Sequence, residues 1–403
     1  MKIGIDCRLW SESGVGRYIR NLVENLRLID KKNEYVLFIL TKDRKEILKH
    51  LACRQAGVQN DKEQVQNDNV KIVKSDVSWH TLEEQLKFPS IINRENLDLM
   101  HFTYISVPIF YNKPFVFTIH DLIPYHFPTG LATTLPLPWY RLKLLSYKFV
   151  ILQAAKRAKK IITASNATKS EIVDHLKVNS SKVVVTYEGV FNKSKVKSQK
   201  SKVQLKIKNY FLYVGNAYPH KNLDRLIKAF SLFCHPELGS GYQSNRDYDR
   251  RQDDIKLVLI GKEDYFYKRL KEKVHNMGLE RLIVFYKEAT DNELSVLYKN
   301  ALALIIPSLM EGFGLPALEA MANRCLVLAS HIPCLKEICA DTAVYFDPYD
   351  VKDMLKKMVN IYHSNDTYHY SDRIEKGLKR AKDFSWEKMA RETLDIYRNA
   401  VAY

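Results

Sequence analysis

The sequence predicts an α/β protein made of two tandem, doubly wound domains. Short apolar runs of strand length recur in both halves of the chain, and most of them are separated by segments of helix length. The series of runs begins at residues 2–5, and a second series begins at residue 210 after a polar stretch. A chain of 403 residues is also too long for one ordinary hydrophobic core, so two domains are expected.

The first half of the chain contains the first series of predicted strands. An apolar stripe at helical spacing runs from Tyr18 to Leu26, directly after the first run. This order indicates a strand–turn–helix unit of a parallel sheet. The predicted strands are residues 2–5, 35–40, 70–73, 97–102, 115–119, 160–165 and 182–187.

The second half repeats this pattern. A helical stripe from Leu223 to Phe233 follows its first apolar run. Residues 191–209 are rich in Lys and Ser, which is typical of a solvated linker. We therefore predict an N-terminal domain at 1–190, a linker at 191–209 and a C-terminal domain from residue 210. Its predicted strands are residues 210–215, 255–261, 282–286, 301–307, 325–330 and 343–347.

The charge balance predicts an anionic partner. The chain has 63 Lys and Arg against 46 Asp and Glu, a formal net charge of +17. Nucleic acid, a phosphorylated substrate and an acidic membrane surface all fit this charge. From Leu122 to Ser170 there is no acidic residue, and basic residues lie there beside an apolar segment. An anionic membrane surface is therefore a candidate partner, and a solvated basic helix is the alternative.

The first residues contain no apolar segment typical of secretion or membrane insertion. We expect a cytoplasmic protein that can attach peripherally to the inner face of the membrane.

The sequence predicts no metal site. The six cysteines include no Cys-x-x-Cys pair and are expected to be reduced, buried thiols. His331, Cys334 and Cys339 lie close together, but their spacing fits no common zinc pattern. Residues 247–249 read Asp-Tyr-Asp, yet no strand precedes them, so a solvated loop is expected there.

Four loops that follow predicted strands carry unusual residues. In parallel sheets of this kind, ligands bind beyond the carboxyl ends of the strands. Glycines at helix starts expose backbone N–H groups that suit phosphate, and a lysine there adds positive charge. Four such loops in two tandem sheets predict one cleft between facing domains. They hold Gly14 and Gly16, His120 and Asp121, Gly215 and Lys221, and Glu311.

Two glutamates lie eight positions apart in the segment PSLMEGFGLPALEAMA, residues 307–322. Glu311 is predicted in a strand-to-helix loop and Glu319 inside the following helix. A loop carboxylate and a helix carboxylate can therefore face one crevice. A solvated pair of acids is the alternative.

Five segments of the chain resemble glycosyltransferase family 4, whose members are retaining enzymes of the GT-B fold. The resemblance implies two Rossmann-like domains that face each other across a cleft. The N-terminal domain would bind the acceptor, the C-terminal domain at 210–386 would bind a nucleotide sugar, and a helix at 387–403 would return to the first domain. The segments cover nearly all of the chain in the family's order: MKIGIDCRLWSESGVGRYIRNL, FTIHDLIPYHFP, YVGNAYPHKNLDRLIKAF, PSLMEGFGLPALEAMA and FSWEKMARETLDIY.

The resemblance also implies roles for individual residues. Glu311 and the backbone amides of the next three residues would hold the hydroxyls of the donor sugar, and Glu319 would hold the ribose. Lys221 would neutralise the diphosphate, and His120 would lie near the reacting sugar. The catalytic candidates are thus His120, Lys221 and Glu311; the donor-binding candidates are Gly16, Asp121, Gly215, Asn216, Gly312, Phe313, Gly314, Leu315 and Glu319.

A family member would transfer a hexose from a nucleotide sugar to a glycan or lipid-linked acceptor, with retention, in cell-surface polysaccharide synthesis. No cofactor or metal is expected, because protein cations can stabilise the leaving group. The family commonly carries arginine where this chain has His220. GDP-mannose is favoured because SGVGRY and PHKN are similar to bacterial mannosyltransferases. UDP-glucose, another UDP-sugar and a nucleotide-sugar epimerase of the same fold are alternatives.

Two other classes of protein fit the sequence less well. A nicotinamide-dependent dehydrogenase would need a third glycine after SGVG and an acid at the end of the second strand, where Thr41 and Lys42 stand. A basic nucleic-acid-binding protein would interleave basic and exposed aromatic residues, but the basic residues here gather in a linker and one helix. We therefore expect no nucleic-acid partner.

Overall fold

The computed structural model describes residues 1–52, 69–131, 133, 135–190, 207, 209–235, 255–286, 288–364 and 367–401. Contacts within the chain divide it into two compact units. Unit 1 comprises Met1–Gly130, Leu135–Gly189 and Ser385–Tyr403, and unit 2 consists mainly of Val190–Phe384. The chain thus leaves unit 1 after Gly189 and returns to it at Ser385, whereas the sequence placed the linker at 191–209 and the return at 387.

The described part of unit 1 is built on a seven-stranded sheet of order β3-β2-β1-β4-β5-β6-β7. All of its neighbouring strands run parallel. The four residues of β4 and the four of β5 are buried, which explains why these strands are mainly apolar and carry only one polar residue each, His101 and Thr118. The strands are β1 (Lys2–Asp6), β2 (Glu34–Ile39), β3 (Val70–Lys74), β4 (Leu99–Phe102), β5 (Phe115–Thr118), β6 (Lys160–Thr163) and β7 (Val183–Val185).

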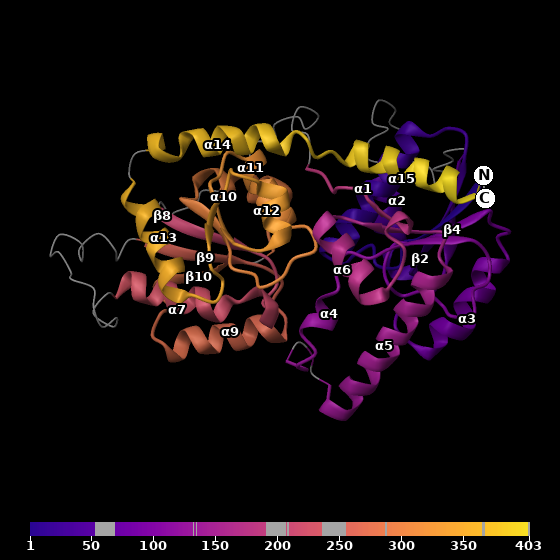
Figure 1. Cartoon of the computed structure of the whole chain (residues 1–403), viewed down its shortest axis with the longest axis horizontal. Helices are drawn as coiled ribbons and strands as arrows, with labels where there is room; N and C mark the ends of the chain where they lie inside the picture. The colour runs from indigo at the N-terminus through magenta and orange to yellow at the C-terminus, as the bar shows by residue number, and fades with distance from the viewer. Residues whose placement is uncertain are drawn as a thin grey trace. The chain divides into compact units, whose positions relative to one another are not determined.

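Helices connect these strands, as a parallel sheet requires. The last helix of the chain, α15, packs against α1 (Figure 1). A buried hydrogen bond of 2.6 Å joins Tyr397 Oη of α15 to His101 Nδ1 of β4. The helices of this unit are α1 (Gly14–Ile29), α2 (Arg44–Ala52), α3 (Leu82–Asn93), α4 (Ile123–His126), α5 (Leu137–Arg157), α6 (Asn166–Leu176) and α15 (Trp386–Val401), with short 3₁₀ helices η1 (Thr41–Asp43) and η2 (Ser180–Lys182).

The described part of unit 2 has a six-stranded parallel sheet of order β10-β9-β8-β11-β12-β13. Its strands are β8 (Asn209–Val214), β9 (Ile255–Ile260), β10 (Ile283–Tyr286), β11 (Ala303–Ile306), β12 (Val327–Ser330) and β13 (Val344–Phe346). Its helices are η4 (Pro219–Lys221), α7 (Leu223–Cys234), α9 (Tyr265–Asn276), α10 (Asp291–Asn300), α11 (Leu315–Ala322), α12 (Pro333–Cys339), α13 (Val351–His363) and α14 (Thr367–Ala381).

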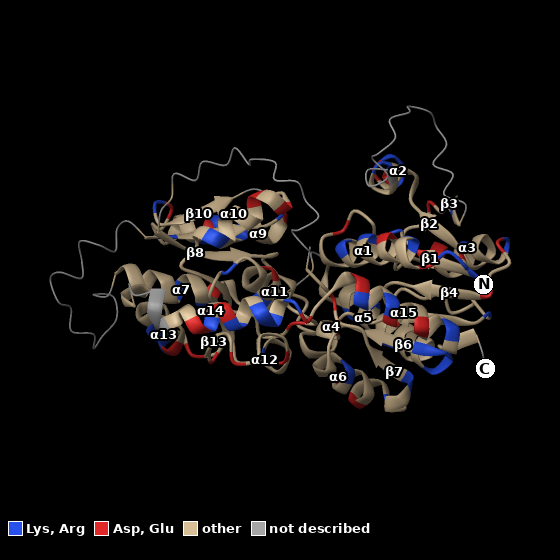
Figure 2. Cartoon of the chain, turned by 90° about the horizontal axis from the view of Figure 1, so that it is seen from above, with Lys and Arg blue, Asp and Glu red and all other residues tan. Residues whose placement is uncertain are grey.

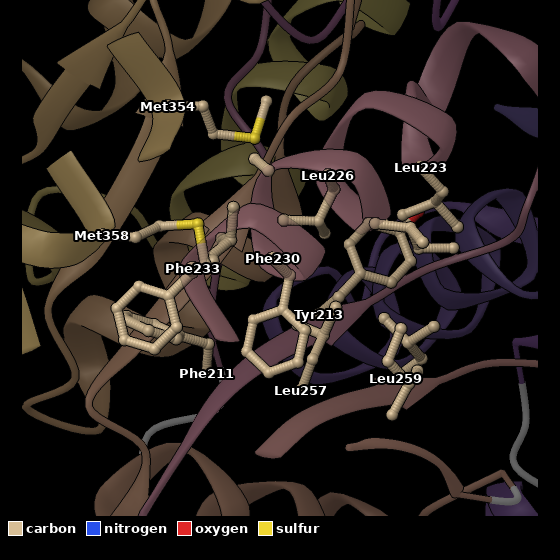
Figure 3. Packing of buried hydrophobic residues seen from close by; sticks show 14 of the residues in the cluster. Phe211, Tyr213, Leu223, Leu226, Phe230, Phe233, Leu257, Leu259, Met354 and Met358 are labelled. Carbon is tan, nitrogen blue, oxygen red and sulfur yellow. The ribbon is translucent and has the colours of Figure 1, made fainter. Parts of the chain in front are cut away.

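The core of unit 2 contains the apolar stripe predicted for the helix after residue 222. Leu226, Phe230 and Phe233 of α7 are buried between the sheet and α13. Met354 and Met358 of α13 lie against the same cluster (Figure 3). Burial of these side chains holds α7, and so the loop that precedes it, firmly on the sheet.

The strand orders identify where a ligand can bind. In each sheet the chain starts in the middle, moves to one edge and then crosses to the other side. The connections therefore diverge between β1 and β4 in unit 1 and between β8 and β11 in unit 2, and ligands bind at such points. The predicted fold class, two doubly wound α/β domains, is confirmed.

None of the described helices is both long enough and apolar enough to cross a bilayer.

Candidate active site

Lys221 and Glu311 form an ion pair at the point in unit 2 where the chain connections diverge. Lys221 ends η4, in the loop after β8, and Glu311 lies in the loop after β11. Because β8 and β11 are neighbouring parallel strands, their carboxyl ends bring the two loops together. Lys221 Nζ lies 2.8 Å from both Oε1 and Oε2 of Glu311. These bonds use two of the three N–H groups of the ammonium, so one donor remains for a ligand.

The carboxylate of Glu311 is held in its charged form. Ser308 Oγ donates a third hydrogen bond to Oε1, at 2.6 Å. Burial alone would raise the pKa of Glu311, but the charge of Lys221 and the hydrogen bonds from Lys221 and Ser308 outweigh it and lower the pKa. Glu311 is therefore an ionised acceptor at neutral pH, able to bind hydroxyl groups.

His220, next to Lys221, is a neutral side chain. Burial, followed by the charge of Lys221, lowers its pKa to about 4, although Glu311 acts in the opposite direction. Its backbone carbonyl accepts a hydrogen bond of 2.8 Å from the amide of Leu309, which joins the two loops. A neutral imidazole does not replace the arginine of the family as a second positive charge.

Asn222 fixes the loop that carries Lys221, and sequence reasoning missed it. Its backbone is left-handed, with φ of 60°, which Asn tolerates better than most residues. Its buried amide donates to the carbonyls of Pro307 and Pro348, at 2.9 and 2.8 Å. The sequence signal that could have identified this role is an Asn placed between a lysine and an amphipathic helix.

The turn after Glu311 brings backbone amides to the start of α11. Gly314 has φ of +96°, a region that favours glycine. A Cβ atom at this position would also lie 2.8 Å from Leu335 Cδ2. The thiol of Cys334 donates to the carbonyl of Phe313 at 3.2 Å. Gly312, Phe313 and Gly314 thus form the predicted turn next to Glu311, and Leu315 is the first residue of α11.

Glu319 lies on α11 and is oriented by a neighbouring helix. Tyr298 Oη of α10 donates a hydrogen bond of 3.0 Å to Glu319 Oε2. The predicted placement of one acid in the loop and the other in the helix is confirmed. Tyr298 is buried and was not a sequence candidate, because nothing in its local pattern distinguishes it from a core residue.

Gly215 and Asn216 form the first turn after β8. Their carbonyl oxygens accept hydrogen bonds from Tyr267 Oη at 2.9 Å and Tyr213 Oη at 2.6 Å. The two tyrosines hold this turn against the sheet.

A cavity of about 500 Å³ lies beyond β9 and β10 in unit 2, next to this turn. The Cα of Gly261 faces the carbonyl of Gly215, so a side chain at 261 would not fit. The cavity is both aromatic and charged, which suits a heteroaromatic ring with polar edges. Sequence reasoning did not identify it. It is lined by Gly261, Lys262, Glu263, Tyr267, Lys271, Phe285, Tyr286 and Glu288.

In unit 1, the predicted site residues follow β1 and β5. Gly16 lies in the first turn of α1, and a Cβ there would meet the carbonyl of Trp10 at 2.4 Å. Close packing of the helix α1 on the preceding loop thus already requires glycine at this position.

Asp121 Oδ1 accepts a hydrogen bond of 3.0 Å from the amide of Ile123. Burial, followed by the charge of Asp121, raises the pKa of Glu171 on α6 to about 7.

His120 is oriented from two sides. Its Nε2 lies 3.1 Å from the carbonyl of Thr103, and since a carbonyl only accepts, Nε2 carries a proton. Its Nδ1 faces Glu188 Oε1 at 3.5 Å. Its ring stacks with Tyr104, with centroids 6.4 Å apart, and meets Tyr18 edge-on at 4.8 Å. Glu188 and Tyr104 were not candidates, although each comes shortly after a strand.

The structure therefore brings Lys221, Glu311 and the turn after Glu311 together in unit 2, and His120 and Asp121 at the edge of the sheet in unit 1. The described residues contain no group of three or more side chains that could hold a metal ion. The five cysteines in the described ranges are buried, and none of them is in a disulfide. The Asp-Tyr-Asp segment at 247–249 lies outside the described residues.

Comparisons with solved structures show the same fold across the chain. A sucrose-phosphate synthase from Thermosynechococcus elongatus superposes with a TM-score of 0.75 at 18% identity, covering 99% of this chain and 98% of that one. The HepE protein of Anabaena, in complex with UDP and glucose, superposes with a TM-score of 0.72 at 15% identity, covering 99% of both chains.

Sequence comparisons identify the family. The model for glycosyltransferase family 4 matches residues 13–191, and the model for group 1 glycosyl transferases matches residues 195–379. An O-antigen chain mannosyltransferase of Salmonella typhimurium is 30% identical over 284 residues, which is 70% of each protein. O-antigen chain mannosyltransferase B of Escherichia coli is 29% identical, over 60% of this chain and 61% of that protein. The chain belongs to glycosyltransferase family 4, with a carboxy-terminal domain of the group 1 type, and is a hexosyltransferase.

Proposed function

We propose that this enzyme transfers mannose from GDP-mannose, with retention, to a growing glycan or lipid-linked acceptor in cell-surface polysaccharide synthesis. The Lys221–Glu311 pair carries the proposal. Its remaining ammonium donor suits a diphosphate, and its ionised carboxylate suits the hydroxyls of a hexose. The O-antigen chain mannosyltransferases at 29–30% identity support the sugar and the pathway class.

The cavity beyond β9 and β10 supports a purine nucleotide. Its volume of about 500 Å³ is within the range of small-molecule sites. Phe285 offers a ring face, and Lys271 Nζ lies 5.6 Å from its centroid. Glu263 and Glu288 add carboxylates, which only accept hydrogen bonds, and guanine presents an amino donor group that uracil lacks.

The metal-free reaction that we propose relies on groups of the chain itself. Lys221 would stabilise the charge that develops on the leaving diphosphate, assisted by the amino-terminal end of α7 directly after it. The amides of the turn from Gly312 to Gly314 and the carboxylate of Glu311 would position the sugar. Unit 1 would bind the acceptor, and in it His120 is held by Thr103 and Glu188.

A panel of nucleotide sugars tests the donor. The purified chain is incubated with GDP-mannose, UDP-glucose, UDP-galactose and GDP-glucose, and slow hydrolysis and thermal stabilisation are measured. We expect hydrolysis and the largest stabilisation with GDP-mannose. Glu288→Gln should weaken the preference for GDP over UDP, since the amide replaces an acceptor with a mixed donor and acceptor. A preference of the wild type for a UDP-sugar would overturn the proposed donor.

UDP-glucose is the second candidate donor, because the HepE structure of the same fold contains UDP and glucose. An epimerase remains a third candidate. It would convert one nucleotide sugar into another without any acceptor, which chromatography of the same reactions detects.

A further inference from the structure

The helix α5 presents a stripe of large apolar side chains to solvent. Leu142, Leu145 and Phe149 are 56%, 66% and 55% exposed. Spacings of three and four residues place them on one face of the helix. Ile151 and Ala154, by contrast, are buried against unit 1. The helix is therefore apolar on both its inner and its outer face, and the outer face lacks a cover in the described part of the chain.

The start of the helix carries two more exposed apolar side chains, which at 100° per residue lie to either side of the stripe. Leu137 and Trp139 are 50% and 66% exposed. The first turns of α5 extend past the neighbouring elements of unit 1 (Figure 1). An amphipathic ring such as that of Trp139 suits the boundary between hydrocarbon and water.

Basic side chains lie next to the stripe. At 100° per residue, Arg141 and Lys148 lie along one side of the stripe, and Lys143 lies farther round the helix, more than about 100° from the stripe's centre. Arg141 and Lys143 are exposed. There is no acidic residue from Leu122 to Ser170, whereas α14 and α15 carry both basic and acidic positions (Figure 2). The helix thus carries basic and no acidic residues beside the stripe.

We propose that α5 is an interfacial helix that inserts Leu142, Leu145 and Phe149 into the surface of an anionic lipid bilayer. An apolar face with basic residues beside it matches acyl chains beneath anionic headgroups. A second copy of this chain would carry the same net charge of +17 and would meet these basic residues with like charge. Charge complementarity therefore favours anionic lipid as the occupant.

Insertion differs from simple electrostatic attraction in its response to salt. Salt screens the contribution of Arg141 and Lys143, but it does not weaken the burial of apolar side chains. Binding to anionic vesicles should therefore fall when salt is added and then level off above zero. The inference rests on the proposed function only in that a lipid-linked acceptor would lie at such a surface.

Flotation of the full chain with vesicles tests the inference, without donor or acceptor. The vesicles are phosphatidylcholine alone and phosphatidylcholine with phosphatidylglycerol, each at low and high salt. The test variant is L142S/L145S/F149S. A matched control, L82S/L86S/F110S, removes two leucines and one phenylalanine that are 83%, 68% and 61% exposed elsewhere on unit 1. Circular dichroism and donor hydrolysis in solution show that each variant is folded.

We expect the wild type and the control to bind anionic vesicles, partly also at high salt, and the test variant to bind at least about tenfold more weakly. Blue-shifted fluorescence on binding that W139F abolishes would add support. Equal binding by the test variant, or complete release of the wild type by salt, would overturn the inference. So would self-association of the wild type that the test variant abolishes. Failure of donor hydrolysis alone would count against the proposed function and leave vesicle binding unaffected.

Discussion

Replacing Glu311 and Glu319 separately should affect different kinetic constants. In the proposed function, Glu311 contacts the sugar, which gains positive charge in the transition state, and Glu319 contacts the ribose, which does not change. An interaction that strengthens in the transition state appears in kcat, and one that is equal in both states appears in KM. Glu311→Ala should therefore mainly lower kcat, and Glu319→Ala should mainly raise the donor KM.

The structure sets the size of these effects. Tyr298 donates a hydrogen bond to Glu319, and a ribose bond of about 1.4 kcal/mol would raise the donor KM roughly tenfold when lost. Glu311 accepts bonds from Lys221 and Ser308, so its loss also leaves a half-buried ammonium without its ion partner. The cost in folding free energy should be about 1.5–3 kcal/mol, which a domain of ordinary stability tolerates.

Steady-state donor hydrolysis, and transfer once an acceptor is known, provide the assay. Circular dichroism and thermal unfolding show whether each variant is folded. Glu311→Gln is the matched control for shape, because it keeps a carbonyl that can accept from Lys221 but removes the charge. Wild-type turnover by folded Glu311→Ala would refute the site assignment, and the two acids would then be surface and packing features.

Three further predictions concern stability. The pKa of His220 falls from 6.5 to about 4 on folding. As the pH falls, the imidazole of residue 220 is therefore protonated in the unfolded chain before it is protonated in the folded one, so the free energy of unfolding decreases below about pH 6.5. His220→Gln should reduce the slope of the unfolding free energy against pH by about 1.4 kcal/mol per pH unit between pH 6 and 5, measured by denaturant titration. Tyr397→Phe leaves buried His101 Nδ1 without its hydrogen bond and should cost about 1–3 kcal/mol of unfolding free energy, whereas an unchanged melting temperature would count against this. At Gly314 φ is +96° and a leucine side chain lies close, whereas at Gly278 φ is +66° and the space is open. Gly314→Ala should therefore lower the free energy of unfolding more than Gly278→Ala does, and equal losses would show that crowding is irrelevant.

The sequence predicted the fold because its signals were local and repeated. Each strand is an apolar run, and each helix such as α7 is a stripe at the spacing of 3.6 residues. Boundaries moved by a residue or two: the strand expected at 115–119 ends at Thr118, and the one expected at 343–347 covers Val344–Phe346. An apolar run in the sequence does not show at which residue the backbone hydrogen bonds to the neighbouring strand end.

The candidate site was predictable where a residue lies next to a strand end or a glycine turn. Lys221, Glu311 and Gly314 satisfy that condition. Asn222 and Tyr298 were missed because their partners, the carbonyls of two prolines and the side chain of Glu319, are distant in sequence. Orienting contacts of this kind depend on how the strands are ordered in the sheet, and a single sequence contains no signal for that order.

In the proposed function, the neutral state of His220 changes how the site would stabilise a leaving diphosphate. Where the family commonly has two cations in sequence, this chain places a buried imidazole with a pKa of about 4 before Lys221. Lys221 already shares two of its donors with Glu311, so its charge is partly compensated before any ligand arrives. The amino-terminal end of α7, which begins at Leu223, lies beside it and adds partial positive charge through its backbone amides. In the proposed function, stabilisation of the leaving diphosphate therefore depends on Lys221 acting together with the amino-terminal end of α7. Lys221→Ala should lower kcat severely in the donor-hydrolysis assay.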